Sequence, residues 1–562
     1  MLEVEKIKNI VRPSYYGIKN FICLPLGFYK YYKVNKFTEV QKKIAKKFKF
    51  FKKKRTNEKD QGVLLVQMVK NYEYTIKLAA ASKAIAEKRN LEVNFYEVDI
   101  NWIWKPTSWA WKTEKFKVLY DVFFTGSLEK IHLSFGGKVI FRTSEKYRDQ
   151  KFIKRELNKI LDNLKDEKAE SILSLRFEDV LVGDLIYDTY LRYFFQPTVE
   201  RIDRNVAHTI EVALNVFYNF KLFLKRHNVR YLLNSYSSYI QHGIPARICL
   251  HNDIGVSTVG SNDYLIQELY KDFPFHINNH TLFDKERRLS IEQLELAKQR
   301  LTSRFKGQID SATSYMKVST YTNTVMSDEL RERFSERPRN IVIYAHDFYD
   351  SPHTDRLLQF PDLYQYLKQT LNELTDLTDT TVFVKIHPNG LKGCKEMTID
   401  LVGNLKKKHI QILDESISNL NIVELKPDLI CTARGTIGIE MAHFEIPTVA
   451  LYDNIYNNFN FVHTCMDKTS YFSILRDKEK PVIDFNKEKI YSFYYQAYIE
   501  KAVLEADNAF LLLHSYKENT YCDEYLKFIL SKLDKVFSEK FIGYYSDAFN
   551  QIQLNNERIS FK

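Results

Sequence analysis

Short apolar runs alternate with helix-like stretches in two separate parts of the chain, and this alternation constrains the fold more than any other feature. In the first part, apolar runs at 62–68 and 91–98 flank a helical stretch that ends near residue 86. This is the order of a βαβ unit, in which a helix joins two parallel strands. The second part repeats the pattern, with apolar runs at 340–345, 381–386, 409–413, 427–431 and 447–452. We therefore expect an α/β protein with two facing Rossmann-like domains.

The same reading divides the chain into four segments. Further strands are predicted in the first half at 117–124, 138–141, 229–233 and 255–260, with a long helix over 206–226. A polar helical stretch over 285–335 is interpreted as the connection between the halves. The predicted segments are a basic aromatic arm (1–60), an N-terminal acceptor domain (61–330), a C-terminal donor domain (331–490) and helices that pack back on the body (491–562).

The net positive charge of the chain comes from its N-terminal arm. The 562 residues include 83 Lys and Arg against 71 Asp and Glu, a net charge of +12. Residues 1–60 hold 17 of those cations and 5 of the anions, which is also +12. The remaining body is neutral, whereas a nucleic-acid-binding domain carries a net basic face. No nucleic-acid partner is therefore expected for the body.

The most basic part of the arm is the segment 41–55. Nine of its fifteen residues are Lys or Arg and none is acidic. In a helix, Ile44, Phe48 and Phe51 would lie along one face, which is typical of a helix on an anionic membrane surface. Each lysine near such a surface contributes roughly 1 kcal/mol. The alternatives are a solvated charged linker and a contact with RNA or DNA.

The sequence favours a cytoplasmic protein at the inner face of the membrane. Its six cysteines are scattered and form no CxxC pair, which fits a reducing compartment. No zinc-type Cys/His spacing occurs, and no bound metal is expected. The longest early apolar stretch, 21–29, is far short of the ~20 residues that span a bilayer, and no signal-peptide pattern accompanies it.

Candidate site residues follow three of the predicted strands in the second half. His346, Asp350 and His353 follow the strand at 340–345, although Asp and Ser residues at such a position also serve as helix caps. His387 and Pro388 directly follow the strand at 381–386. Because ligands bind outside the carboxyl ends of parallel strands, these side chains are candidates for binding a phosphate or a leaving group.

The third candidate segment follows the strand at 427–431. Gly435 lets the backbone turn tightly, and Thr436 stands where a helix would begin, so that free N–H groups attract phosphate. Thr436 and Glu440 are four residues apart and share a helix face, so one can meet phosphate while the other reaches a ribose hydroxyl. The alternative is an N-cap and a surface glutamate. No GxxxxGK[ST] and no GxGxxG after a strand occurs, so neither a P-loop ATPase nor a dehydrogenase is supported.

At these residues the sequence resembles GT-B glycosyltransferases of bacterial capsule and surface-polysaccharide biosynthesis. The resemblance is carried by VKIHP at 384–388 and by RGTIGIE at 434–440 followed by Ile446 and Pro447. Weaker support comes from 346–353 with 360–367 and from 183–192. A His-Pro pair followed by a loop with Ser or Thr is shared by polysialyltransferases, Kdo transferases and CDP-glycerol polymerases.

The resemblance implies a metal-independent glycosyltransferase without a cofactor. Its donor would be a nucleotide-sugar, such as CMP-Kdo or CMP-sialate, and its acceptor an oligosaccharide or lipid-linked glycan. The donor-binding residues implied at matching positions are Lys385, Pro388, Arg434, Gly435, Thr436, Glu440, Asp350 and His353. His387, with His346 as a second candidate, would stabilise the leaving phosphate.

The acceptor hydroxyl also needs a general base. Asp184 and Asp188 are four residues apart in GDLIYDTYLR, so one helix face would present both. The alternative is a helix cap at Asp184 and a solvated Asp188. His242 and Asp253 are weaker candidates for the base.

Three other functions remain open on the sequence alone. The first is another enzyme of the same fold, such as a nucleotide-sugar epimerase or a CDP-polyol phosphotransferase. The second is a non-catalytic scaffold of a glycan assembly complex. The third is a nucleic-acid-binding protein that uses the arm, which the neutral body makes the weakest of the three.

Overall fold

The structure is a computed structural model, and it describes the larger part of both halves of the chain. The described residues are 62–69, 72–98, 100, 132–134, 137–143, 146–259, 266–276, 283–309, 316, 318–321, 326–355, 359–391, 393–479, 481–500 and 546. The predicted arm and the predicted strand at 117–124 lie outside them. Within these residues, no helix is both long and apolar enough to cross a bilayer.

The first sheet has six strands in the order β3-β2-β1-β6-β7-β8. All neighbouring pairs are parallel except β7 and β8, which are antiparallel. Chain order therefore reverses beside β1, since β2 and β3 lie on one side of it and β6 and β7 on the other. The strands are β1 (Val63–Gln67), β2 (Glu92–Val98), β3 (Val139–Thr143), β6 (Val229–Asn234), β7 (Gly255–Thr258) and β8 (Gln267–Leu269).

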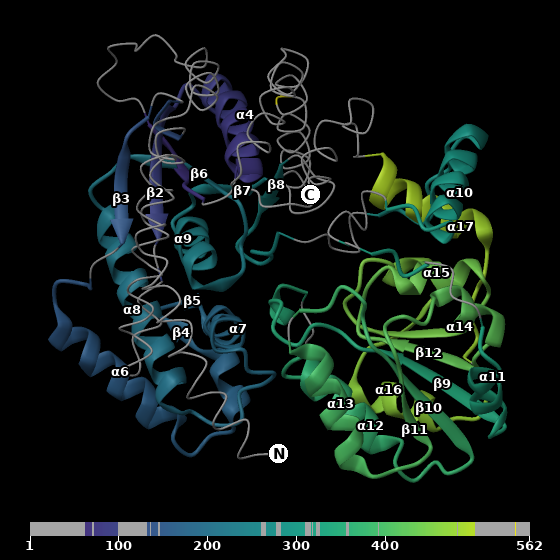
Figure 1. Cartoon of the computed structure of the whole chain (residues 1–562). Helices are drawn as coiled ribbons and strands as arrows, with labels where there is room; N and C mark the ends of the chain where they lie inside the picture. Colours follow the sequence, from purple (N-terminus) through teal and green to yellow (C-terminus); the bar gives the residue numbers. More distant parts are fainter. Residues whose placement is uncertain are drawn as a thin grey trace, which may run out of the picture. The chain divides into compact units, whose positions relative to one another are not determined.

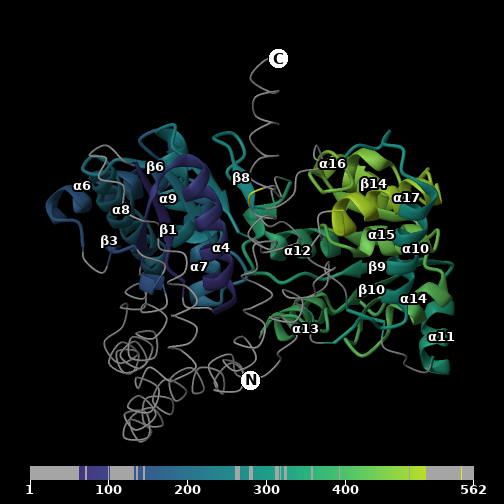
Figure 2. The same cartoon turned by 90° about the horizontal axis from the view of Figure 1, so that it is seen from above.

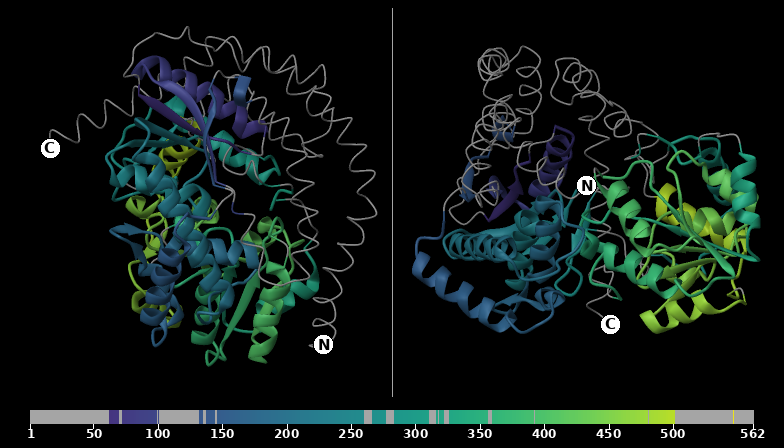
Figure 3. Two further views of the ribbon diagram at one scale, coloured as in Figure 1. Left: turned by 90° about the vertical axis from the view of Figure 1, so that its left-hand side faces the viewer. Right: turned by 60° about the horizontal axis from the view of Figure 1, so that its bottom comes forward.

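Helices and a small hairpin complete the first unit. Helix α4 packs on β1, β2 and β6, and α9 packs on β6 and β7 (Figure 1). The long helix α8 packs against α6, and Figure 3 shows this pair in blue from two further sides. These elements are α4 (Tyr72–Arg89), α6 (Gln150–Leu164), η2 (Ala169–Ser174), β4 (Arg176–Phe177), β5 (Val180–Leu181), α7 (Gly183–Phe194), α8 (Arg204–Leu224) and α9 (Tyr239–His251).

The second sheet has six parallel strands in the order β11-β10-β9-β12-β13-β14. This is the 3-2-1-4-5-6 order of the Rossmann fold. Strands β10 and β12 are buried along their whole length and β9 at its centre, as expected of parallel strands covered on both faces. The strands are β9 (Arg339–Tyr344), β10 (Thr380–Lys385), β11 (Ile410–Leu413), β12 (Leu429–Thr432), β13 (Thr448–Leu451) and β14 (His463–Cys465).

Two groups of helices cover the faces of this sheet. One core joins Val342, Phe383 and Ile430 of the strands to α11, α14 and α15. In the other group of helices, α12 contacts both α13 and α16 (Figure 1). The helices are α11 (Asp328–Ser335), η5 (Pro352–Asp355), α12 (Leu363–Glu373), α13 (Cys394–Leu405), α14 (Asn419–Leu425), α15 (Ile437–His443), η6 (Asn457–Phe459) and α16 (Lys468–Arg476).

The prediction of two Rossmann-like sheets in one α/β chain, the GT-B-like fold class, is confirmed. The described residues from 283 onward belong to the second compact unit, whereas the boundary expected from the sequence lies at 330. Helix α10 (Ile291–Phe305) packs on α17 (Lys487–Tyr494) and η7 (Tyr495–Ile499), which are seen beside it in Figure 2. A buried aromatic core that includes Phe305 and Phe493 holds them together. Residues Tyr190–Glu200 also belong to this second unit.

Candidate functional site

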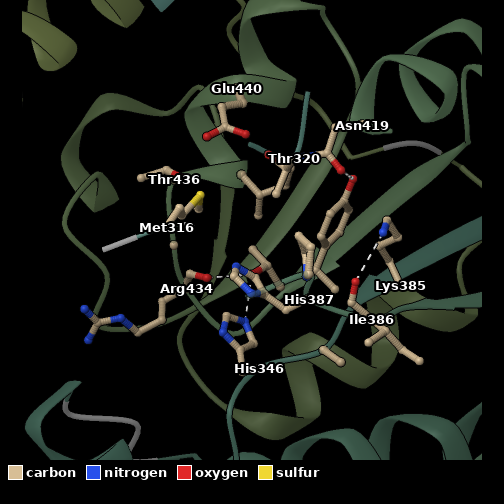
Figure 4. Close-up of a pocket in the computed structure, with 16 residues that line it drawn as sticks. Met316, Thr320, His346, Lys385, Ile386, His387, Asn419, Arg434, Thr436 and Glu440 are labelled. Carbon is tan, nitrogen blue, oxygen red and sulfur yellow. Dashed lines mark hydrogen bonds between the residues drawn. The ribbon is translucent and has the colours of Figure 1, made fainter. Parts of the chain in front are cut away.

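One pocket of the second unit lies at the carboxyl ends of β9, β10 and β12 (Figure 4). It brings His387 together with the turn that starts at Arg434, as the strand-end reading predicts. His346 from the loop after β9 lines the same pocket. The lining residues are Met316, Thr320, Tyr344, Ala345, His346, Lys385, Ile386, His387, Pro388, Asn419, Thr432, Arg434, Gly435, Thr436, Ile437 and Glu440.

The His387 ring has one N–H group for which the described residues offer no acceptor. Its Nδ1 accepts a hydrogen bond of 3.1 Å from the backbone N–H of Asn389, so Nδ1 carries no proton. In the neutral ring the proton is therefore on Nε2, and no residue in the described part of the chain accepts a hydrogen bond from it. Burial, reinforced by Lys385, lowers the pKa of His387 to about 4. At neutral pH the side chain is an uncharged hydrogen-bond donor.

Hydrogen bonds to two other segments hold the loop that carries His387. The Asp347 carboxylate accepts the backbone N–H of Leu391 at 2.7 Å. The Asn389 side chain makes a pair of bonds with the backbone of Val318, at 3.0 Å and 2.8 Å. Burial raises the pKa of Asp347. These bonds hold the orientation of the imidazole before any ligand arrives.

His346 is the second neutral histidine of the pocket, and it has the other tautomer. Its Nε2 accepts the backbone N–H of Ala433 at 3.2 Å and lies 3.0 Å from the Thr432 hydroxyl. That hydroxyl donates its own proton to the Arg434 carbonyl at 2.7 Å, so the His346 proton is on Nδ1. Burial first, then His387 and Arg434, lowers the pKa of His346 to about 3. His346 thus fastens the loop after β12 to the loop after β9.

The turn after β12 and the helix α15 that follows it each contain a glycine in a tight position. Gly435 has φ +117°, a backbone conformation that only glycine adopts without strain. The Tyr456 hydroxyl donates to the Gly435 carbonyl at 3.1 Å. A Cβ on Gly438 would lie 2.4 Å from that same hydroxyl. The Arg434 side chain extends away from both histidines in Figure 4.

Glu440 lies at the centre of a buried ion-pair network. Arg304 of α10 donates to it at 2.5 Å, and the Tyr321 hydroxyl donates at 2.6 Å. The side chains of Arg304 and Glu440 are each only 3% exposed. Arg304 also donates to the Thr436 hydroxyl at 3.1 Å. Burial and the neighbouring Glu440 carboxylate raise the pKa of Tyr321, so its hydroxyl stays protonated. The sequence predicts that Glu440 reaches a ribose hydroxyl. In the structure, both of its carboxylate oxygens already accept hydrogen bonds from protein side chains.

Lys385 lines the pocket, but its ammonium group is used by the backbone. Its Nζ donates to the carbonyls of Ile386, Asp414 and Glu415 at 3.2, 3.0 and 3.3 Å, which matches the three donors of an ammonium. Burial lowers its pKa to about 8. Its visible role is to join the end of β10 to the loop after β11.

The other two predicted donor-binding residues do not line this pocket. Asp350 is mostly exposed and lies 3.6 Å from Arg192. His353 donates from Nε2 to the Pro361 carbonyl at 2.8 Å. That bond keeps η5 close to the start of α12.

The candidate general bases Asp184 and Asp188 lie on α7 in the first unit, and both are buried. Arg247 of α9 binds both carboxylate oxygens of Asp184, at 2.6 Å and 2.5 Å. This bidentate ion pair is a strong interaction that joins α7 to α9. The alternative of a solvated Asp188 is contradicted, since Asp188 is only 2% exposed. Asp253 lies in the exposed turn after α9.

Among the residues that the sequence does not mark are Arg304 and Tyr321, which bind the pocket residue Glu440. Arg304 and Tyr321 come from the polar stretch that was interpreted as a connection, and no local pattern marks either of them. Only the packing of α10 against α15 and α17 brings Arg304 to Glu440. Among the residues that the structure describes, no three His, Cys, Asp or Glu side chains are placed to hold a metal ion.

Comparisons with known proteins find distant likenesses among solved structures. No protein-family model and no curated protein sequence matches the chain. Thermosulfurimonas dismutans KpsC, a β-Kdo 2,4 transferase, is 10% identical over 50% of this chain and 88% of that chain, with a TM-score of 0.31. The Methanocaldococcus jannaschii UDP-GlcNAc 2-epimerase, solved with UDP-GlcNAc and UDP, is 14% identical over 76% and 98%, with a TM-score of 0.22. A Rickettsia africae glycosyltransferase is 12% identical over 87% and 99%, with a TM-score of 0.21. At such TM-scores the likeness does not decide the function, which rests on the residues of the pocket.

Proposed function

We propose that the chain is a glycosyltransferase that moves a sugar from a nucleotide-activated donor to a capsule or surface-polysaccharide acceptor. The observation that carries this proposal is the Nε2–H of the neutral His387, for which the described residues offer no acceptor, in one pocket with His346 and the Gly435 turn. A departing nucleotide phosphate needs such fixed donors, because negative charge grows on it in the transition state.

In this reaction the bond between the anomeric carbon and the donor phosphate oxygen breaks, and a bond to the acceptor oxygen forms. The acceptor hydroxyl loses its proton to a base. His387 donates its Nε2–H to the phosphate oxygen as that oxygen becomes an anion. The bonds of Asn389 and Asp347 already hold the His387 ring and its loop in place. Little reorganisation of this hydrogen-bond donor is therefore needed at the moment of transfer.

We propose a CMP-linked donor, such as CMP-Kdo or CMP-sialate, on the His-Pro pair at 387–388 and the loop at 434–440. A thermal-shift screen with CMP, CDP, UMP and UDP tests nucleotide binding first. Transfer assays with CMP-Kdo, CMP-sialate, CDP-glycerol and UDP-sugars then identify the donor. A polyol phosphotransferase would use CDP-glycerol, and a scaffold would bind none of the nucleotides.

The role of His387 is tested by substitution. We expect His387→Ala to lower turnover at least ~100-fold, the scale of losing one preorganised donor. His387→Gln, which keeps an N–H donor, should retain more activity than the alanine variant. The matched control is His463→Ala, in β14 and outside the lining of the pocket, which should transfer at the wild-type rate. Near-normal transfer by a folded His387→Ala protein would refute the role.

A further inference from the structure

The first unit carries a polar cluster at the carboxyl ends of its two central strands. Gln67 is the last residue of β1 and Asn234 the last of β6, and these strands are neighbours at the point where chain order reverses. Both side chains are buried. Such a reversal point is where open α/β sheets bind ligands. Nothing in the pocket of the second unit involves these residues.

Gln67 determines the tautomer of His242. The Gln67 Oε1 accepts the backbone N–H of Ser235 at 3.1 Å and the Ser235 hydroxyl at 2.8 Å. Because a backbone N–H only donates, Oε1 is the oxygen, and Nε2 of Gln67 is the atom 2.7 Å from His242 Nδ1. That amide group donates, so Nδ1 is unprotonated. The proton of neutral His242 is therefore on Nε2, and among the residues that the structure describes none accepts a hydrogen bond from that atom.

The walls of the cluster are aromatic. The Tyr236 ring meets the His242 ring edge-on at 5.7 Å and the His276 ring edge-on at 5.1 Å. His276 is held like His242, since its Nδ1 accepts the backbone N–H of Ser237 at 3.2 Å. The Tyr236 hydroxyl bonds that of Tyr74, whose ring also lies 5.3 Å from the Lys77 ammonium.

The bonds that hold the cluster join uncharged groups: Gln67 with Ser235 and His242, Ser237 with His276, and Tyr96 with Asn234. Burial first, and then His276, lowers the pKa of His242 to about 3. The imidazole is thus neutral at physiological pH and half-buried, with its Nε2–H donor beside aromatic rings. An uncharged donor next to aromatic walls suits the hydroxyl oxygens of a sugar better than a phosphate, which favours cations.

We propose that this cluster binds a hydroxyl oxygen of the acceptor sugar, with His242 Nε2–H as the donor. His242 is then a binding residue and not the general base, because neither ring nitrogen of the neutral tautomer has a free lone pair for a proton. Gln67 is the positioning residue that sets the tautomer. This inference rests on the proposed function, since the acceptor of that reaction is a glycan.

The test is saturation-transfer NMR on the full chain with four neutral probes: methyl glucoside, methyl galactoside, methyl mannoside and methyl N-acetylglucosaminide. We expect at least one glycoside to receive saturation from the wild-type protein. His242→Phe keeps a ring but removes the donor, and the loss of one hydrogen bond should weaken binding about threefold to tenfold. The matched control is His251→Phe on the same helix, which should bind as the wild type does.

A second measurement reads the tautomer directly in the wild-type protein, with one variant as a comparison. In a spectrum of the wild-type protein with ¹⁵N-labelled histidine, the His242 imidazole should show an unprotonated Nδ1 and a protonated Nε2 at pH 7. In Gln67→Glu, the acceptor oxygen in place of the amide N–H should move the proton to Nδ1.

Three results would overturn the inference. They are the absence of transfer to any glycoside, equal transfer with folded His242→Phe, and a wild-type His242 protonated on Nδ1. The thermal shift with nucleotides reports separately on the pocket of the second unit. A nucleotide shift that persists in His242→Phe would leave the proposed function standing even if the acceptor inference fails.

Discussion

Three histidines of this protein are kept neutral by the same arrangement. A peptide or amide N–H donates to one ring nitrogen of His346, His387 and His242, and burial disfavours the cation. Each ring is left with its proton on the opposite nitrogen. The choice of nitrogen is made by the donor, so it differs between His346 and His387. Neutral donors of this kind give hydrogen bonds without adding a charge to a buried site.

This arrangement predicts how stability depends on pH. The folded-state pKa is about 3 for His346 and about 4 for His387, against 6.5 in the unfolded chain. Between about pH 4 and pH 6.5 the unfolded chain binds protons that the folded chain does not, so stability is lost as pH falls through this window. At pH 5 each histidine is expected to cost about 2 kcal/mol relative to pH 7.5. Urea unfolding at the two pH values measures the loss, which should be smaller in His387→Gln. An equal loss in that variant would contradict the assignment.

At the scale of elements, the connection between β12 and β13 is shaped by contacts that a single methyl group would disturb. We expect Gly438→Ala to destabilise the fold by about 1–3 kcal/mol, because its Cβ would lie 2.4 Å from the Tyr456 hydroxyl. The matched control is Gly403→Ala in α13, where nothing lies within 4 Å of the added Cβ. That change should be neutral or stabilising by up to about 1 kcal/mol. Denaturant unfolding distinguishes the two, and equal effects would argue against the close contact.

The attachment of α10 to α15 depends on the pair formed by Arg304 and Glu440. Arg304→Met leaves a buried carboxylate without its cation and is expected to cost about 3–5 kcal/mol. The double variant Arg304→Met with Glu440→Gln should lose less than the sum of the two single changes. Arg331 and Glu424 form a comparison pair, 2.7 Å apart and about half exposed. Arg331→Met there should cost no more than about 1 kcal/mol. Additive losses at 304 and 440 would show that the pair is not coupled.

At the scale of the whole molecule, charge is divided unevenly along the chain. The neutral body and the arm with its net +12 lead us to propose that residues 41–55 hold the protein on an anionic membrane. Deletion of 1–55 should abolish cosedimentation with vesicles of phosphatidylcholine and phosphatidylglycerol, while vesicles of phosphatidylcholine alone should bind neither form. High salt should weaken binding of the full chain. If the deletion variant still sediments with the anionic vesicles, the arm is not the anchor.

Much of the fold could be predicted from the sequence, because each buried strand is a local apolar run bounded by turn residues. The run at 381–386 and the His-Pro pair after it are contiguous, so both β10 and the strand-end position of His387 follow from local order. Gly435 likewise marks its turn through a conformation that only glycine adopts easily. Parallel pairing then brings the ends of β9, β10 and β12 to one edge, which places His346 and His387 in one pocket.

Only the tertiary structure decided which side chains already form hydrogen bonds or ion pairs within the protein. Nothing local predicts that Arg304, more than a hundred positions away, binds Glu440, or that Arg247 holds both oxygens of Asp184. The tautomer of His242 depends on Gln67, which is 175 residues distant along the chain. Strand positions come from the local hydrophobic pattern, whereas hydrogen bonds and ion pairs between distant segments form only once packing has brought them within a few ångströms.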